Sequence, residues 1–317
     1  MTLFTVVVPM KNAAPFVQMA LRSVLEQAVD LEVVVVDDGS TDKSVDLVNE
    51  LGDARVRIVP GPQRGIAAAL NAGLEAAQGE IIARCDADDL FATGRLEWQK
   101  EWLEAHPDFG AVCGAYAAMD SKGRLLTMFG KNAAALEITD DLRGGTTRTS
   151  FCTYAVRAEH LRQVGGFRSY FATAEDLDLQ YRLGEVCRVW WEPQPCYWYR
   201  LHERSTTHTQ ADALRRFYEV VAKEFSRQRQ VSGMDDLARG CPPSPPKTCG
   251  DHPALLREQI HGFLNSRAWT ACREGRRMEA LVLGSRALVA RPERLASWVN
   301  LVKLGARCLL PGAPEKE

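Results

Sequence analysis

Short apolar runs alternate with amphipathic stretches along the first third of the chain. Four runs rich in Val and Ile have the length and composition of buried strands, and they cover residues 3–9, 32–36, 55–59 and 80–85. Between them, apolar side chains recur three and four positions apart, which is the spacing of one helix face. This alternation predicts an α/β fold in which a mostly parallel, Rossmann-like sheet is covered by helices on both faces.

The helices predicted between these strands have recognisable ends. Asn12 can cap the first helix, whose Val17 and Leu21 lie on one face. The third helix is predicted over residues 66–77, where Ala is frequent and Gly79 follows shortly after the end. Ligands of such sheets bind beyond the carboxyl ends of the strands, so the loops at that edge are the first candidates for a site.

The rest of the chain divides into a less regular middle and a helical tail. We predict four more strands in the middle, at residues 111–119, 150–156, 187–191 and 196–201. An amphipathic helix follows over residues 211–228.

A Pro-rich segment separates two predicted domains. The first covers residues 1–230, with halves at 1–110 and 111–230, the linker covers residues 231–252, and an all-helical, tetratricopeptide-like extension covers residues 253–317. A single unit of this kind is shorter than the roughly three repeats that are stable alone, so we expect the extension to pack on the main domain or on a partner. A plain helical cap is the equally balanced alternative.

Composition limits the classes of partner and the compartment. The 317 residues carry 39 basic and 41 acidic side chains, a net charge of −2, which makes nucleic acid a poor candidate partner. No window reaches the roughly 18 apolar residues of a spanning helix, and no signal peptide is recognisable. The nine cysteines have no regular spacing, which is typical of free thiols in a reducing cytosol. We therefore expect a cytoplasmic protein.

Acidic side chains gather where the second and fourth strands end. Asp86, Asp88 and Asp89 follow the fourth strand, and three carboxylates so close together repel one another unless something compensates them. Mg²⁺ or Mn²⁺ is a natural compensator at this position, and an acidic surface turn is the equally balanced alternative. Asp38 follows the second strand, where it could accept hydrogen bonds from a base or ribose, or belong to a helix cap with Ser40.

Two later groups of polar residues are ambiguous by themselves. Glu175 and Asp176 open a predicted helix, and acidic residues are favoured there by the helix dipole. Asp176 could instead be a general base, although spacing alone favours the structural interpretation. Arg200 and His202 close the last predicted strand and suit contacts with phosphate or metal.

Taken together, these segments resemble the family 2 glycosyltransferases, whose domain is the GT-A fold. The similarity covers about residues 3–208 and rests on several independent motifs in the same order and spacing. The motifs are Val7-Val8-Pro9 with Asn12, residues 35–42, Arg64-Gly65 with Asn71, Asp86 with Asp88 and Asp89, Gly165-Gly166-Phe167, Glu175-Asp176, and Tyr199-Arg200 with His202 and Ser205.

The resemblance implies a nucleotide-sugar site in residues 1–110. Asp38 would contact the nucleobase, and Pro9 and Asn12 would line the nucleoside pocket. Arg64 would reach the base or the phosphates. Asp86 would hold the ribose side of the donor.

The resemblance also implies a metal site. Asp88 would bind the Mg²⁺ or Mn²⁺ that bridges the diphosphate, and His202 would approach the metal or the diphosphate. Arg200 would support His202 at the substrate site. Asp89 would support the loop or face the acceptor sugar.

The implied chemistry is a single in-line displacement. Asp176 would deprotonate the acceptor hydroxyl and Glu175 would orient it, so that the anomeric configuration inverts. The expected reaction moves a sugar from a nucleoside diphosphate sugar, UDP-sugar favoured, to a saccharide or lipid-linked acceptor in surface polysaccharide or glycolipid assembly. Residues 253–317 would make a peripheral contact with the inner face of a membrane or with a protein.

Other functions remain as alternatives. A nucleotidyltransferase or a Rossmann dehydrogenase needs a Gly-rich loop after the first strand, and residues 9–16 contain no Gly. A non-catalytic nucleotide-sugar-binding or scaffold protein would use the helical tail for partner binding. The presence of Asp88 and Asp176 favours the enzyme over the scaffold.

Overall fold

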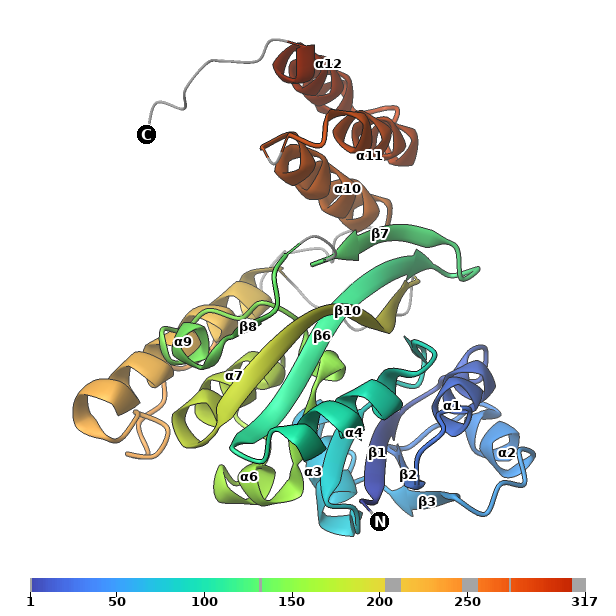
Figure 1. Cartoon of the computed structure of the whole chain (residues 1–317), viewed down its shortest axis with the longest axis vertical. Helices are drawn as coiled ribbons and strands as arrows, with labels where there is room; N and C mark the ends of the chain where they lie inside the picture. The colour runs from blue at the N-terminus through green and yellow to red at the C-terminus, as the bar shows by residue number, and fades with distance from the viewer. Residues whose placement is uncertain (1, 131–132, 203–211, 247–255, 274, 310–317) are drawn as a thin grey trace. The chain divides into compact units, whose positions relative to one another are not determined.

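The computed structural model describes residues 2–130, 133–202, 212–246, 256–273 and 275–309 (Figure 1). The chain forms two compact units. The first comprises residues Met1–Ala118, Met128–Arg200 and Ala213–Thr248, and the second comprises Met119–Thr127, Leu201–Asp212 and Cys249–Glu317. The end of the predicted linker, residues 247–252, lies outside the described residues.

Within the described residues, ten strands form one sheet in the order β3-β2-β1-β4-β9-β6-β10-β5, with β7 beside β6 and β8 beside β10. The strands are β1 (Phe4–Met10), β2 (Leu31–Asp37), β3 (Val56–Pro60), β4 (Ile81–Arg84), β5 (Leu90–Phe91), β6 (Phe109–Asp120), β7 (Leu125–Phe129), β8 (Leu136–Glu137), β9 (Ala155–Arg157) and β10 (Arg188–Leu201). The helices are α1 (Val17–Leu25), α2 (Ser44–Asn49), α3 (Ile66–Ala76), α4 (Arg95–Ala105), α5 (Thr139–Arg143), α6 (Ala158–Gln163), α7 (Glu175–Val186), α9 (Asp212–Ser232), α10 (Leu256–Arg273), α11 (Arg277–Ala290) and α12 (Leu295–Leu309).

The sheet has a parallel half and an antiparallel half. Strand β1 pairs in parallel with β2 and β4, and β2 pairs in parallel with β3. Strand β9 then pairs antiparallel with both β4 and β6, and β10 pairs antiparallel with β5 and β8. The α/β fold class is confirmed, and the register places Met10 opposite Asp37, so both strand-end loops open at the same edge.

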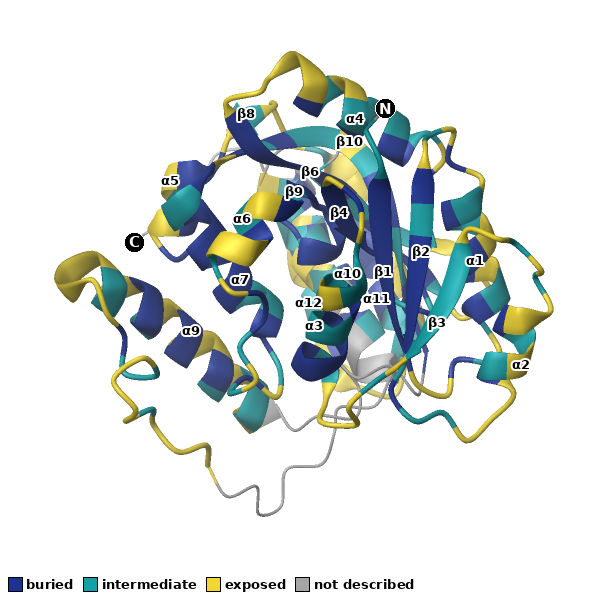
Figure 2. Cartoon of the chain, turned by 90° about the horizontal axis from the view of Figure 1, so that it is seen from below, coloured by how far each residue is buried: buried dark blue, intermediate teal, exposed yellow. Residues whose placement is uncertain are grey.

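Alternating side chains of β1 build two hydrophobic cores, one on each face of the sheet. Val6 and Val8 pack in a cluster with Leu21 of α1, which also includes residues of α4. Val7 points the other way into a cluster that contains Leu70 of α3 and residues of α6 and α7. Figure 2 shows the buried central strands with α1 and α2 on one side and α3 on the other. Because both faces are covered, the central strands β1 and β2 are mostly apolar.

The first helix begins later than predicted, and Asn12 does not cap it. Helix α1 begins at Val17, after Pro15, and a proline disfavours the helical conformation in the residue before it. Asn12 instead has a φ of 54°, in the left-handed region. Its side-chain oxygen accepts a hydrogen bond from the Thr41 backbone N–H at 2.8 Å, so it ties the loop after β1 to the loop after β2.

The two strands predicted at 187–191 and 196–201 are one continuous strand, β10. Pro193 and Pro195 lie between the two predicted stretches. On one edge of β10, however, β8 pairs as far as Trp191 and β5 starts at Tyr197. On this edge the prolines fall between the two paired stretches, where a missing N–H removes no ladder hydrogen bond.

The strand predicted at 150–156 is also only partly present. Residues Phe151–Thr153 form a 3₁₀ turn, because the Ser150 hydroxyl accepts a hydrogen bond from the backbone N–H of Cys152, and the strand β9 follows. This turn brings the Cys152 side chain to the loop after β4.

The second unit contains the three helices of the predicted helical extension. Leu264 and Ala268 of α10 pack with Leu283 of α11 and Leu304 of α12 in a separate hydrophobic core. In the described parts of the chain, no helix is both long and apolar enough to cross a membrane.

The outer face of α12 is apolar. Leu295, Trp298, Val299 and Val302 recur three and four positions apart, and their relative exposures are 77%, 52%, 42% and 71%. The buried face of the same helix contains Leu304.

Candidate active site

Arg84, the last residue of β4, joins the two acidic motifs. Its guanidinium binds Asp86 in a two-pronged ion pair, with Nε to Oδ1 at 2.6 Å and Nη2 to Oδ2 at 3.1 Å. The same group donates through Nη1 to Glu175 at the start of α7, at 3.3 Å. Arg84 and Glu175 are both buried, so this bridge holds the loop after β4 against the helix that begins with Glu175 and Asp176.

The carboxylates after β4 are compensated largely by protein groups. Arg84 neutralises Asp86, as described above. Asp89 is 1% exposed and accepts hydrogen bonds at 2.7 Å from the Tyr197 hydroxyl and from the Arg200 backbone N–H. Burial, together with the nearby charges of Asp88 and Asp86, raises the pKa of Asp89 well above its ordinary value. Protein groups thus compensate Asp86 and Asp89, and the metal predicted from the sequence concerns Asp88, for which it stays a prediction.

Asp88 is half-buried, as Asp86 is. Its backbone carbonyl accepts a hydrogen bond from Nε of Arg200 at 2.7 Å, and the buried Arg200 guanidinium lies over the ring of Phe16, 5.0 Å from the centroid. Arg200 thus supports the loop itself. The sequence also predicted that Arg200 supports His202, and that role stays a prediction.

The donor set around Asp88 fits Mg²⁺ or Mn²⁺ in one particular binding mode. Over the described residues, no three His, Cys, Asp or Glu side chains gather in a group that could hold a metal. Mg²⁺, however, is usually held by only one or two carboxylates together with substrate phosphates and water. Asp88 can supply such a carboxylate to an ion that also binds a diphosphate.

Helix α7 begins at a strained turn that presents two carboxyl groups. Ala174, just before the helix, has a φ of 59°, which is unusual for a residue with a side chain. Burial and the neighbouring Asp176 raise the pKa of Glu175 to about 7, although Arg84 opposes the shift. Burial also raises the pKa of Asp176, again against the effect of Arg84. Both groups thus have pKa values moved toward neutrality, which suits general acid–base work.

The loops after β1 and β2 form the predicted nucleoside end. Asp38 is buried, and its Oδ1 accepts a hydrogen bond from the Gln63 backbone N–H at 2.6 Å. Pro9 lies in β1 opposite Val36, and Asn12 joins the two loops as described above. Arg64 is exposed next to Gln63, just before α3. These residues share the edge of the sheet at which the carboxylates after β4 lie.

Two predicted residues fall outside this geometry. His202 follows β10 and belongs to the second unit, whereas Asp88 belongs to the first, so a contact of His202 with a metal at Asp88 stays a prediction. Ser205 lies outside the described residues.

Three contributors were missed by the sequence analysis. Arg84 stands two positions before Asp86, and an arginine next to an acidic cluster is a signal that could have been used. The Tyr197 hydroxyl donates to Asp89 and accepts from the Asp86 backbone N–H at 3.0 Å, and the Cys152 thiol donates to Asp86 at 3.6 Å. Nothing in the local sequence indicated either of these long-range contacts.

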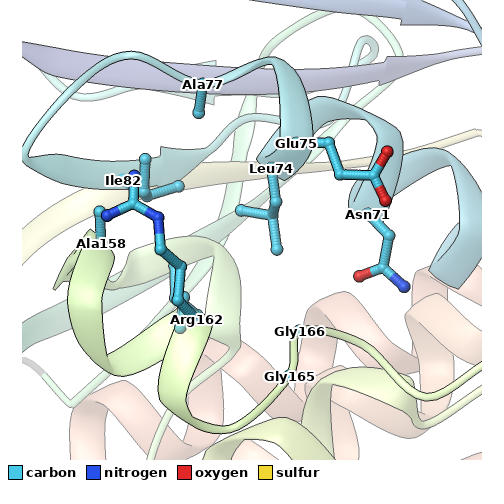
Figure 3. A pocket seen from close by; sticks show the side chains of 10 residues that line it. Asn71, Leu74, Glu75, Ala77, Ile82, Ala158, Arg162, Gly165 and Gly166 are labelled. Atoms are coloured by element: carbon cyan, nitrogen blue, oxygen red, sulfur yellow. The ribbon is translucent and has the colours of Figure 1, made fainter.

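A separate cavity of about 390 Å³ lies between α3 and α6 (Figure 3). It is lined by residues of both helices together with Ile82 and Gly165-Gly166, and none of the predicted site residues lines it. At its margin, Asn71 binds the backbone of Phe167 in both directions, at 2.7 and 2.8 Å. The motif around Gly166 is therefore a structural clasp between α3 and the segment before α7.

Comparisons with known proteins agree with this architecture. A family model described as glycosyl transferase family 2 matches residues 5–164, half of the chain. Chondroitin synthase of Pasteurella multocida strain Pm70 is 30% identical over 234 residues, which cover 73% of this chain and 24% of that protein. The chain thus spans about a quarter of the length of this curated relative.

Solved structures show the same fold. Residues 1–349 of TarS from S. aureus, in complex with UDP-GlcNAc, superpose with a TM-score of 0.61 at 18% identity, covering 98% of this chain and 88% of that one. The mannosyltransferase PcManGT from Pyrobaculum calidifontis, in complex with GDP-Man and Mn²⁺, has a TM-score of 0.53 at 22% identity, covering 97% and 81%. At these identities the likeness establishes the GT-A-like fold alone.

Proposed function

The chain belongs to glycosyl transferase family 2, and from this premise we propose that it transfers a sugar, with inversion, from a nucleoside diphosphate sugar to an acceptor hydroxyl. The observation that carries the proposal is the bridge formed by Arg84. A single buried guanidinium contacts both Asp86, in the loop proposed to bind the donor, and Glu175, next to the proposed base Asp176. The loop proposed to bind the donor and the helix that carries the proposed base are therefore joined by a single side chain, that of Arg84.

The proposed donor is a UDP-sugar. Asp38, Asn12 and Pro9 would bind the nucleoside, and Arg64 would reach the base or the phosphates. The TarS structure contains UDP-GlcNAc and the PcManGT structure contains GDP-Man, which supports a nucleotide sugar and leaves GDP as the comparison donor. A saccharide or lipid-linked acceptor in polysaccharide or glycolipid assembly fits the chondroitin synthase relative.

The proposed reaction is one displacement at the anomeric carbon. The acceptor hydroxyl oxygen forms a bond to that carbon while its proton passes to the Asp176 carboxylate, and the bond to the diphosphate oxygen breaks on the opposite face. Asp86 holds the ribose side, and Asp89 and Arg200 keep the loop in place. When bound at Asp88, Mg²⁺ or Mn²⁺ would neutralise the leaving diphosphate, with His202 as a further contact.

Release of nucleoside diphosphate from UDP-GlcNAc and GDP-Man, with and without Mn²⁺, tests this proposal. Asp176→Asn should leave donor binding nearly intact and lower turnover by roughly 10²–10⁴-fold, the usual contribution of a general base. Asp88→Ala should abolish metal-dependent release. Asp46→Asn, on the exposed face of α2, is the matched control and should behave as the wild type. Unchanged turnover in Asp176→Asn would remove this residue from the mechanism.

The same assay separates the enzyme from the scaffold alternative. A non-catalytic nucleotide-sugar-binding protein would bind the donor, which thermal shift detects as increased stability, but would release no diphosphate. Binding without release under all metal conditions would therefore favour the scaffold.

We also propose that the second unit makes a peripheral contact with the anionic inner face of a membrane. Residues 256–309 contain ten Lys and Arg and four Asp and Glu, a net charge of +6 in a chain whose total is −2. The apolar face of α12 includes Trp298, and an amphipathic helix with Trp and basic residues is typical of interfacial binding. Co-sedimentation of the full chain with anionic but not zwitterionic vesicles, lost in Trp298→Ser, is the expected result. Failure to bind either vesicle would favour a protein partner.

A further inference from the structure

A buried ionic network holds the segment that leads into helix α7. Arg182, on α7 itself, donates to the backbone carbonyls of Val164 and Gly166 at 2.7 and 2.8 Å. It also pairs with Asp178 at 2.8 Å, and Asp178 has no exposed surface. The start of α7 is thus tied to the turn that precedes it.

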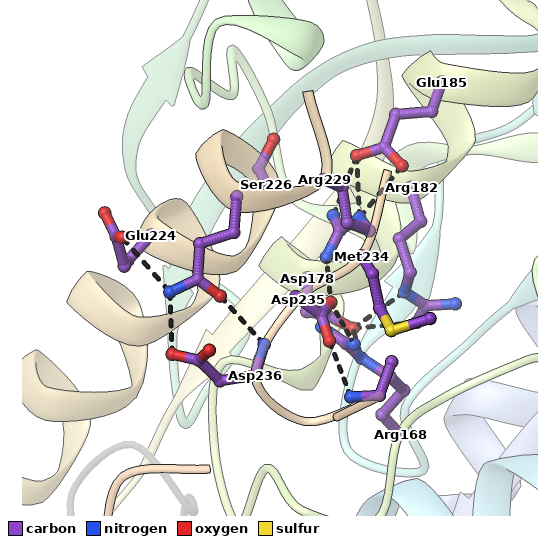
Figure 4. A network of polar contacts seen from close by, with 12 residues as sticks. Arg168, Asp178, Arg182, Glu185, Glu224, Ser226, Arg229, Met234, Asp235 and Asp236 are labelled. Atoms are coloured by element: carbon purple, nitrogen blue, oxygen red, sulfur yellow. Dashed lines mark hydrogen bonds and ion pairs between the residues drawn. The ribbon is translucent and has the colours of Figure 1, made fainter. Parts of the chain in front are cut away.

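Arg168 extends this network to a part of the chain far away in sequence. Its guanidinium forms a two-pronged ion pair with Asp178 and, through Nη1, a hydrogen bond of 2.6 Å with Asp235 (Figure 4). Asp235 is 1% exposed and lies in the turn that follows α9. One arginine therefore bridges a carboxylate of α7 and a carboxylate of the α9 turn.

Asp235 is itself held from the other side. Arg229 of α9 donates to Asp235 at 2.6 Å, and the Ala238 backbone N–H donates to it at 2.9 Å. Arg229 also forms a two-pronged pair with Glu185, near the end of α7. The turn after α9 is consequently anchored to the end of α7 through Arg229 and to its beginning through Arg168.

Aromatic packing fixes Arg168 in this position. The guanidinium lies over the rings of Phe171 and Phe225, at 5.5 and 5.2 Å from their centroids. Phe171 stands three positions before Ala174, whose left-handed backbone aims Glu175 and Asp176. Arg168 thus contacts both the segment before the proposed base and the helix after it.

We propose that Asp235 is a positioning residue for transfer, which acts through Arg168 to hold the first turn of α7, and with it Asp176, in its working geometry. The inference rests on the proposed function. Residues 5–164 match the family model, and Asp235 lies outside them. The contact of Asp235 with Arg168 therefore belongs to the part of the chain that the family model does not describe. Without Asp235, Arg168 loses one of its two buried carboxylates, and the segment before α7 keeps its aromatic contacts with α9 but loses its ionic link to the turn after that helix.

The expected effect follows from the sensitivity of catalysis to geometry. A displacement of about 1 Å in a reacting group can lower turnover by roughly 10²-fold. Asp235→Asn keeps the shape of the side chain but not its charge, so we expect kcat to fall by roughly 10- to 100-fold, with the donor KM changed by no more than about twofold. A residue that only stabilised the fold would lower the melting temperature and leave kcat per folded molecule unchanged.

Arg229→Gln is the matched control. It removes the other buried partner of Asp235 and the pairs with Glu185, but it leaves the bridge from Asp235 through Arg168 to Asp178 in place. We expect a loss of thermal stability similar to that of Asp235→Asn, with kcat close to the wild-type value. If Asp235→Asn does not yield folded protein, Arg168→Lys serves instead, since a single ammonium cannot bind Asp178 by two prongs and reach Asp235 as well.

The outcomes distinguish a failure of the positioning role of Asp235 from a failure of the proposed function. Transfer by the wild type, a kcat loss in Asp235→Asn and none in Arg229→Gln would support the positioning role. Transfer by the wild type with equal kcat in all three proteins, or with losses that only follow thermal stability, would overturn it. No transfer by the wild type with any donor would contradict the proposed function. Amide hydrogen exchange over residues 166–176 would then test directly whether Asp235 holds this segment through Arg168. Unchanged protection in Asp235→Asn would overturn that role, and lost protection would support it.

Discussion

Replacing Glu175 with Gln should change how stability depends on pH. The Glu175 carboxyl is buried beside Asp176, and its pKa is raised from the ordinary 4.5 to about 7. Between these values the folded protein keeps a proton on Glu175 that the unfolded chain has already lost. Unfolding therefore releases a proton, and the contribution of Glu175 to the free energy of unfolding falls as the pH rises through this interval.

The size of the effect follows from the two pKa values. Each pH unit between them is worth about 1.4 kcal/mol, so the contribution of Glu175 to the free energy of unfolding should fall by about 3 kcal/mol from pH 4.5 to pH 7. Gln has the same shape and does not titrate. The stability of the wild type relative to Glu175→Gln should consequently decline by roughly this amount across the interval, and remain constant below it.

Urea unfolding followed by tryptophan fluorescence, at several pH values from 4.5 to 8, measures this difference. Comparing the wild type with Glu175→Gln at each pH cancels the titration of the groups that do not interact with Glu175. The neighbouring Asp176 does interact with it, so its own change in titration is part of the measured difference. Glu101→Gln, on the exposed face of α4, is the control and should show no pH-dependent difference. A Glu175→Gln difference that does not change with pH would refute the reasoning, because it would mean that burial does not retain the proton.

Three further results are expected. Tyr197→Phe removes the hydroxyl that joins Asp89 to the Asp86 backbone, and should cost about 1–3 kcal/mol in urea unfolding along with a loss of turnover. Gly166→Ala should lower the free energy of unfolding more than Gly165→Ala in the same assay. Both glycines have a positive φ, but a Cβ at Gly166 would lie 2.6 Å from the Asn71 side-chain oxygen, whereas a Cβ at Gly165 would meet no atom within 4 Å. Chelation by EDTA should suppress diphosphate release, and Mg²⁺ or Mn²⁺ should restore it; full activity in excess chelator would contradict the metal assignment.

Hydrophobic periodicity located the parallel half of the sheet well. Strands β1, β2 and β3 lie within a residue or two of their predicted positions. Strands β1 and β2 are buried on both faces and therefore appear as Val-rich runs. The short β5 and β8 have two residues each, too few to show a period, and they were not predicted. The single strand β10 was predicted as two, and the prolines between the two stretches give no local sign that the strand is continuous.

The candidate residues were easier to find than the contacts that arrange them. Asp86 and Glu175 stand out as acidic groups at element ends, but the arginine that joins them reaches across 91 positions of sequence. The bond from Tyr197 to Asp89 spans 108 positions. Local pattern carries no information about such pairs, so the structure was needed to show which protein groups compensate Asp86 and Asp89.

The same long-range contacts restrict how this domain can move. Tyr197 and Arg200 fasten β10 to the loop after β4, and Arg84 fastens that loop to α7. A hinge opening between the amino-terminal and carboxyl-terminal parts of the sheet would have to break all of these buried bonds together. We therefore expect the two parts to move as one rigid body on the timescale of turnover, so that substrates enter and products leave without the domain itself opening and closing.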